Sequence, residues 1–216
     1  MNLLKRKLLT LFITGTGTDI GKTVVAAILA EALQADYWKP VQAGTSPLTD
    51  SVWVRNMLTN KKSIVHPETY LLKIPASPHI AAEKEGIEIS LQKITDQKPK
   101  TNNHLLIEGA GGLLAPLNKN EFSIDLIKRL EAIVIIVSKN YLGSINHSLL
   151  TANALKQKKV KVMGWIFNEE YIDYEDEIVE WSGYPWIASV RSLEVIDKPV
   201  IHAQAMKMRE HMKNFL

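Results

Sequence analysis

The residues best placed to do chemistry are a lysine and a threonine that follow a glycine-rich turn. The segment from Phe12 to Leu33 reads FITGTGTDIGKTVVAAILAEAL, and Lys22 and Thr23 stand where a short apolar run gives way to an apolar helical pattern. Glycines let a backbone curl round an anion, and the free amides at a helix start face negative charge. In such a turn a lysine reaches phosphate oxygens and a threonine hydroxyl ligates Mg²⁺. The segment therefore predicts a phosphate-binding loop.

The spacing of this loop is stretched relative to the usual pattern. Four residues usually separate the two glycines of GxxxxGK[ST], whereas five separate Gly15 from Gly21. The alternative is an ordinary strand–helix turn with an exposed lysine. The order of strand, glycine turn, GKT and helix favours the phosphate loop.

Three further charged residues follow apolar runs and could meet this loop. Glu108 ends the run HLLIE, where an acid holds a metal directly or through water, although a solvent-facing glutamate is the alternative. Asp50 opens a helical pattern and, taken alone, is equally well explained as a helix cap. Lys39, in YWKPVQAG, could stabilise charge on a transferring phosphoryl group, and an ordinary surface lysine is the alternative.

For these charged residues to meet the glycine-rich loop, strands and helices should alternate along the chain. We expect strands at 8–14, 37–41, 104–108, 133–138, 160–168 and 186–190, and helices at 21–34, 50–59, 91–97, 123–130, 145–156, 174–181 and 203–215. The span 60–100 is the least regular and is expected to hold long loops. Runs such as AIVIIV are apolar on both faces, which indicates a parallel sheet between helices. The predicted fold class is α/β, a doubly wound, mostly parallel sheet of the P-loop NTPase type, with ligands beyond the carboxyl ends of the strands.

Length and composition exclude several classes of protein. The chain has 216 residues and no cysteine, which suits one domain over 1–216 and excludes disulfides, thiolate zinc sites and cysteine nucleophiles. Its net charge of +3 gives no argument for nucleic acid. No apolar run approaches the roughly 20 residues that span a bilayer. The run at 8–13 leads into Gly-Thr-Gly rather than a signal-peptide cleavage site. We expect a soluble, cytoplasmic protein.

Six stretches of the chain together resemble the dethiobiotin synthetase family, over most of the sequence from Phe12 to about Leu193. In family order they are GTGTDIGKT, YWKPVQAG, PASPHIAAEKEG, LLIEGAGGLLAPL, YLGSINHSLLTANAL and GWIFNE. The stretched phosphate loop is this family's own variant. The resemblance implies an ATP-dependent ligase of biotin biosynthesis that joins 7,8-diaminononanoate and CO₂ into the cyclic urea of dethiobiotin. In that reaction one amine captures CO₂ as a carbamate, ATP phosphorylates the carbamate, and the second amine closes the ring.

The resemblance also implies roles for individual residues toward MgATP. Lys22 clamps the phosphates, Lys39 neutralises the carbamate and the moving phosphoryl group, and Thr18 lies where the family binds phosphate and substrate. Asp19 takes the place of a carboxylate common in the family, and Asn168 hydrogen-bonds the adenine edge. The implied ATP-binding residues are Gly17, Thr18, Asp19, Ile20, Gly21, Lys22, Thr23, Glu108 and Asn168. The implied Mg²⁺ ligands are Thr23, Asp50 and Glu108.

A second implied set of residues binds the diamine. Besides Lys39, the backbone at Gly111 and Gly112 should face this substrate. The turn that opens a helix within YLGSINHS offers amides to the substrate's carboxylate, and its residues are Gly143, Ser144, Ile145 and Asn146. In the family this carboxylate is bound across a dimer interface, so a homodimer is implied. The expected partners are small-molecule substrates and a second copy, with neither nucleic acid nor membrane.

The sequence departs from the family pattern at three positions. Ala43 and Ala76 stand where many members carry a hydroxyl residue, so contacts to substrate could be missing. Arg191 occupies the place of a proline after the last core strand, which could loosen the nucleotide preference.

Three other classes remain as alternatives. A cobyrinic acid amidating ligase usually carries a glutamine-hydrolysing domain with a cysteine, which this chain lacks. A partitioning ATPase carries an extra lysine where this chain has Gly17, and a GTP-dependent switch carries Asn-Lys-x-Asp where it has Asn168-Glu169-Glu170.

Overall fold

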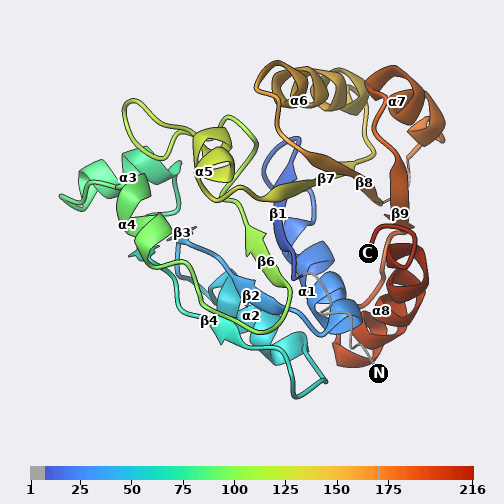
Figure 1. Ribbon diagram of the computed structural model, residues 1–216, viewed down its shortest axis with the longest axis horizontal. Coiled ribbons are helices and arrows are strands. Elements are labelled where there is room, and N and C mark those ends of the chain that lie inside the picture. Colours follow the sequence, from blue (N-terminus) through green and yellow to red (C-terminus); the bar gives the residue numbers. More distant parts are fainter. Residues whose placement is uncertain (1–7, 170) are drawn as a thin grey trace, which may run out of the picture.

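A parallel sheet runs through the centre of the molecule. The computed structural model, shown in Figure 1, describes residues 8–169 and 171–216. The strands of the main sheet, in spatial order, are β4 (Val65–His66), β2 (Asp36–Trp38), β6 (Leu105–Glu108), β1 (Thr10–Gly15), β7 (Ile133–Lys139), β8 (Val162–Asn168) and β9 (Trp186–Val190). All pairings between these strands are parallel. A smaller parallel sheet holds β3 (Val41–Ala43) and β5 (Tyr70–Leu72).

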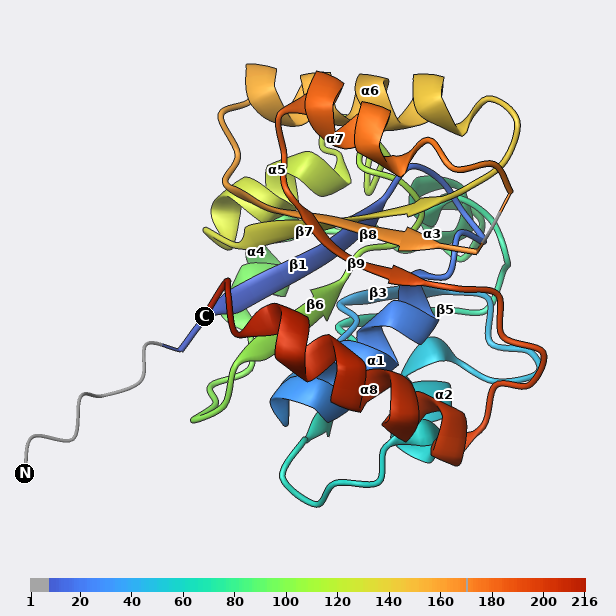
Figure 2. The ribbon, with the colours of Figure 1, turned by 90° about the vertical axis from the view of Figure 1, so that its right-hand side faces the viewer.

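Helices cover both faces of the main sheet, as Figure 2 shows. One core layer is closed by α1 (Lys22–Leu33), α2 (Asp50–Met57) and α8 (Lys198–Met212). The other is closed by α3 (Pro78–Lys84), α4 (Leu91–Asp96), α5 (Ser123–Arg129), α6 (Ser144–Gln157) and α7 (Glu175–Ser182). Because side chains alternate along a strand, Leu11 and Ile13 pack toward α1 while Phe12 packs into the opposite layer. The expectation of a doubly wound α/β fold is confirmed.

The predicted strand at 37–41 is wrong, because the chain changes sheet within it. β2 ends at Trp38, and β3 begins at Val41 in the smaller sheet. Pro40 stands between them and lacks the N–H that a continuous strand would use. Its carbonyl instead accepts hydrogen bonds from the amides of Thr69 and Tyr70. The break leaves Lys39 just beyond the carboxyl end of β2.

Two other expectations need correction. The last helix begins at Lys198 rather than near 203, because the Asp197 side chain caps it by accepting a hydrogen bond from the amide of Val200 at 2.9 Å. The span 60–100 contains β4, β5 and α3 where long loops were expected, whereas α4 agrees with the helix predicted at 91–97. The remaining predicted elements agree with the structure to within about two residues at most ends.

The N-terminal apolar run is described from residue 8 onward. Of the apolar run at 8–13, residues 10–13 lie in β1, and residues 1–7 lie outside the described part of the chain. Within 8–169 and 171–216, none of the helices has both the length and the apolar character needed to cross a bilayer.

Candidate active site

The glycine-rich turn connects the carboxyl end of β1 to the start of α1. Gly21, just before the helix, has a φ of 87°, in the left-handed region that favours glycine. Gly15 ends β1, and a Cβ there would lie 2.1 Å from Cδ1 of Ile20, so a larger residue would have to displace this buried side chain. The ammonium of Lys22 donates to the carbonyl of Gly17 at 2.7 Å, which closes the turn on itself. The sequence therefore builds a curled loop that ends at a helix start, where free amides favour an anion.

A pocket of about 980 Å³ opens beside this loop at the carboxyl edge of the sheet. It brings together residues that are far apart in the sequence but follow neighbouring strands. The predicted site residues that line it are Thr18, Asp19, Gly21, Lys22, Thr23, Lys39, Asp50, Glu108, Gly111, Gly112 and Asn168. Ala43, Ala76 and Arg191, the departures from the family pattern, line it as well. The position agrees with the rule that open α/β sheets bind ligands beyond the strand ends.

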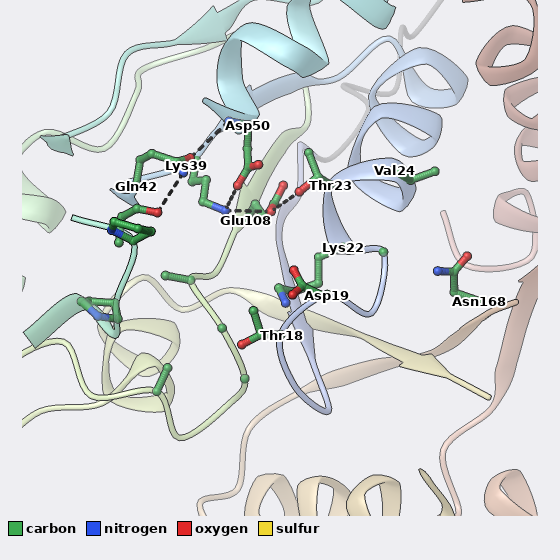
Figure 3. A pocket seen from close by; sticks show the side chains of 18 of the residues that line it. Thr18, Asp19, Lys22, Thr23, Val24, Lys39, Gln42, Asp50, Glu108 and Asn168 are labelled. Carbon is green, nitrogen blue, oxygen red and sulfur yellow. Dashed lines mark hydrogen bonds and ion pairs between the residues drawn. The ribbon is translucent and has the colours of Figure 1, made fainter. Parts of the chain in front are cut away.

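Lys39 lies between two carboxylates at the centre of the pocket (Figure 3). Its ammonium pairs with Asp50 and donates to Oε1 of Glu108 at 2.9 Å. The hydroxyl of Thr23 donates to the same oxygen at 2.8 Å. Lys39 is 6% exposed and Glu108 is 1% exposed, so the readings of a surface lysine and a solvent-facing glutamate are wrong. Thr49, which accepts from the amide of Val52, is the cap of α2, so Asp50 is not the cap.

The environment shifts the pKa values of the two pocket lysines, Lys22 and Lys39, in opposite directions. Burial lowers the pKa of Lys22 from 10.5 to about 8, although the charge of Glu108 acts against this shift. Burial also favours a lower pKa for Lys39, but the charges of Glu108 and Asp50 outweigh it and raise the pKa of Lys39 above its ordinary value. Lys39 is therefore a cation throughout the physiological range, whereas Lys22 loses its proton just above that range in the nucleotide-free protein.

The lowered pKa of Lys22 makes nucleotide binding depend on pH. Phosphates bind the protonated ammonium, so affinity is expected to be level below about pH 8 and to fall above it by up to about tenfold per pH unit. Calorimetry with ATP in EDTA, from about pH 7 to pH 9.5, measures this without any contribution from a metal. The matched variant Lys22→Arg keeps its charge over this range, so its affinity should stay level. A level curve for the wild-type protein would contradict the assignment.

The oxygen donors near Lys39 suit a hard divalent cation. Thr23 contributes a hydroxyl, and Asp50 and Glu108 contribute carboxylates, which are the ligand types that Mg²⁺ prefers. Among residues 8–169 and 171–216 there is no group of three or more His, Cys, Asp or Glu side chains that could hold a metal by itself. Phosphate oxygens and water would therefore complete the coordination, as is usual for Mg²⁺ at a nucleotide.

The end of the pocket away from Lys39 is formed by two stretches of chain, one from the last residue of β8 onward and one that follows β9. Asn168 and Glu169 come from the first, and Arg191, Ser192 and Leu193 come from the second. Figure 3 shows Asn168 on the opposite side of the phosphate loop from Lys39. The amide of Asn168 donates to the carbonyl of Ile20 at 3.0 Å, so this side chain also holds the loop in place.

Other predicted site residues lie apart from the pocket. Gly17 and Ile20 belong to the loop, but neither of these described residues is among those that line the cavity. The same holds for the described turn Gly143, Ser144, Ile145 and Asn146, which begins α6. In that turn the hydroxyl of Ser144 is 2.7 Å from the hydroxyl of Tyr174.

Sequence reasoning missed two residues that hold the acids of the pocket. Tyr37 donates its hydroxyl to Oε2 of Glu108 at 2.8 Å. Gln42 accepts from the amide of Asp50 at 3.2 Å. No local signal pointed to Tyr37, because its contact with Glu108 depends on the pairing of β2 with β6.

Comparison with known proteins gives close sequence relatives. A protein-family profile described as AAA domain matches residues 9–200. A protein of Cytophaga hutchinsonii named ATP-dependent dethiobiotin synthetase BioD is 51% identical over 91% of this chain and 95% of its own length. A protein of Christiangramia forsetii with the same name is 44% identical over 93% of this chain and 96% of its own length.

The similarity of this chain to solved structures shows its fold alone. A plasmid partition protein of Borrelia burgdorferi B31, bound to AMPPNP, superposes with a TM-score of 0.65 at 10% identity, over 98% of this chain and 100% of that chain. The likeness agrees with the expected P-loop NTPase type of α/β fold.

Proposed function

The chain belongs to the family of ATP-dependent dethiobiotin synthetases, and we propose that the pocket beside its phosphate loop is where the ring of dethiobiotin closes. The protein is an enzyme, an ATP-dependent carbon–nitrogen ligase of biotin biosynthesis, and it acts on small molecules. The single observation that supports this site is the contact of Lys39 and Thr23 with one buried oxygen of Glu108 at the edge of the loop.

The residues of the phosphate loop would bind the phosphates of ATP. The amides before α1 and the ammonium of Lys22 provide positive charge, and Thr18 and Asp19 line the pocket from the same loop. Thr23, Asp50 and Glu108 would hold Mg²⁺, which supplies neutralisation of phosphate charge when bound. Asn168 would meet the adenine edge at the far end of the pocket. These placements agree with the need of phosphoryl transfer for positioning and charge stabilisation.

Lys39 would stabilise the negative charge that the reaction brings together. A carbamate oxygen and a phosphoryl group must approach each other in line, and each carries negative charge. A buried cation whose raised pKa keeps it protonated offsets that charge at fixed geometry. The diamine would then lie toward Gly111 and Gly112, which line the pocket beside the loop.

We also propose that the enzyme works as a homodimer. The turn from Gly143 to Asn146 lies outside the pocket of its own chain, so its amides would be available to the carboxylate of a substrate held by another copy. Leu142, next to this turn, is 84% exposed, and Leu150 on α6 is 59% exposed. Exposed apolar side chains beside a binding turn favour a protein contact there.

We propose that residues 1–216 form a single domain, because the described helices pack on the two faces of one main sheet. We propose a cytoplasmic protein without nucleic-acid or membrane partners, which agrees with the net charge of +3 and the absence of cysteine.

Arg191 is expected to affect nucleotide binding rather than the chemical step. It lines the end of the pocket near Asn168, on the other side of the phosphate loop from Lys39 and Glu108. An exposed cation contributes about 1 kcal/mol to such contacts, so Arg191→Ala should raise KM for ATP about fivefold and leave kcat unchanged. Steady-state kinetics with ATP and with GTP would measure this and show whether discrimination between the bases falls. A loss in kcat would contradict this placement.

The activity itself is tested by product formation. Incubation with MgATP, ¹³C-bicarbonate and 7,8-diaminononanoate should give dethiobiotin that carries the label, detected by mass, with ADP and phosphate. ATP hydrolysis without this product would reject the proposed reaction and favour a partitioning-type ATPase. Lys213→Ala, at an exposed pair with Glu210 outside the pocket, is the control variant that should keep full activity.

A further inference from the structure

A buried tyrosine contacts the acid at the centre of the pocket from behind. Tyr37 in β2 is 0% exposed, and its hydroxyl donates to Oε2 of Glu108 at 2.8 Å. The other oxygen of this carboxylate, Oε1, accepts from Thr23 and Lys39. The two oxygens of Glu108 therefore have separate donors, one inside the sheet layer and two at the pocket.

The register of the sheet explains how this contact forms. β2 pairs with β6 so that Tyr37 lies opposite Leu106. Side chains alternate along each strand, so Tyr37 shares a face with Leu106 and Glu108. That face packs against α1, which carries Thr23. Trp38 faces the other layer, where its indole nitrogen donates to the carbonyl of Pro67. The tyrosine thus reaches diagonally to the acid from the neighbouring strand.

We propose that Tyr37 is a positioning residue that fixes the rotation of the Glu108 carboxylate, so that Oε1 alone is presented to Thr23, Lys39 and a bound Mg²⁺. This inference rests on the proposed function of the pocket. A carboxylate with one oxygen held by a buried hydroxyl cannot turn to chelate through both oxygens. A charge-assisted hydrogen bond of this kind is among the stronger ones in proteins. Tyr37 touches no reacting atom and acts through Glu108.

Tyr37→Phe removes the hydroxyl and keeps the ring. The measured quantity is the gain in affinity for a non-hydrolysable ATP analogue on addition of Mg²⁺, obtained by calorimetry with Mg²⁺ and with EDTA. We expect Tyr37→Phe to reduce this gain about tenfold, because the freed carboxylate samples other rotations, and to leave the affinity in EDTA unchanged. If Tyr37 had only a structural role, its replacement by Phe would lower thermal stability without changing the Mg²⁺ gain.

Tyr70→Phe is the matched control. Tyr70 is also a buried tyrosine, at 6% exposure, and its hydroxyl accepts from the amide of Ser90 at 2.9 Å. It does not line the pocket in the described chain, so its loss should leave the Mg²⁺ gain unchanged. An unchanged gain in Tyr37→Phe, or an equal reduction in Tyr70→Phe, would overturn the proposal.

A second measurement uses the wild-type protein and does not depend on the variant folding. The hydroxyl proton of Tyr37 is buried and should exchange slowly, so NMR should observe it. It should persist when Mg²⁺ and the nucleotide analogue are added, and its loss on Mg²⁺ addition would overturn the proposal. Both readouts are independent of product formation. An intact Mg²⁺ gain in a wild-type protein that makes no dethiobiotin would therefore reject the proposed function alone.

Discussion

Lys22→Ala is expected to abolish dethiobiotin formation, with a fall of about 10³-fold or more in kcat/KM. Removal of one donor aimed at developing charge typically costs about 10²–10³-fold, and Lys22 should contact the phosphates in the ground state as well. Its ammonium donates to the carbonyl of Gly17, and Lys22 as a residue is 7% exposed. Steady-state assays and calorimetry with ATP should show that turnover and binding are lost together.

The fold of this variant should remain intact, because Lys22 contacts a carbonyl in the loop and anchors no packed element. Circular dichroism and thermal unfolding provide that control. If Lys22→Ala kept more than a tenth of the wild-type kcat/KM, Lys22 would not be the phosphate clamp.

Lys39→Ala is expected to lose about 10³-fold in kcat while KM for ATP changes little. The ammonium pairs with Asp50 and Glu108, so its charge should matter mainly when the phosphoryl group moves. Lys39→Met keeps most of the volume without the charge and should show the same loss. Near-normal turnover in either variant would end the catalytic assignment.

The same substitution should also change stability in a metal-dependent way. Without Lys39, the buried carboxylate of Glu108 lies near Asp50 with no cation between them. Loss of one partner from a buried ion pair costs about 3–5 kcal/mol. The unfolding temperature of Lys39→Ala should therefore fall in EDTA and recover in part with Mg²⁺ and ATP. Equal unfolding temperatures for variant and wild type in EDTA would contradict this account of the acid pair.

The sequence was most informative where chemistry and local structure coincide. Lys22 and Thr23 follow a glycine turn whose order of elements is readable along the chain, and both line the pocket. Lys39 and Glu108 were placed at strand ends, and parallel pairing of β2 with β6 brings them together. The roles of these residues in catalysis and metal binding stay predictions.

Other features depended on contacts that local patterns do not contain. Tyr37 meets an acid 71 residues away, and only the pairing of β2 with β6 reveals that contact. Asp50 opens α2, so a cap was an equal alternative until the structure showed Thr49 in that role. The break at Pro40 was missed because apolar residues continue through it into β3.

The most direct test of the central claim is a crystal structure of the protein soaked with a non-hydrolysable ATP analogue and MgCl₂. We expect the β and γ phosphates to lie within hydrogen-bond distance of the amides of residues 17–23 and of the Lys22 ammonium, with a metal peak beside Thr23 and Glu108. Nucleotide bound elsewhere, with this loop empty and Lys22 still on the carbonyl of Gly17, would contradict the account.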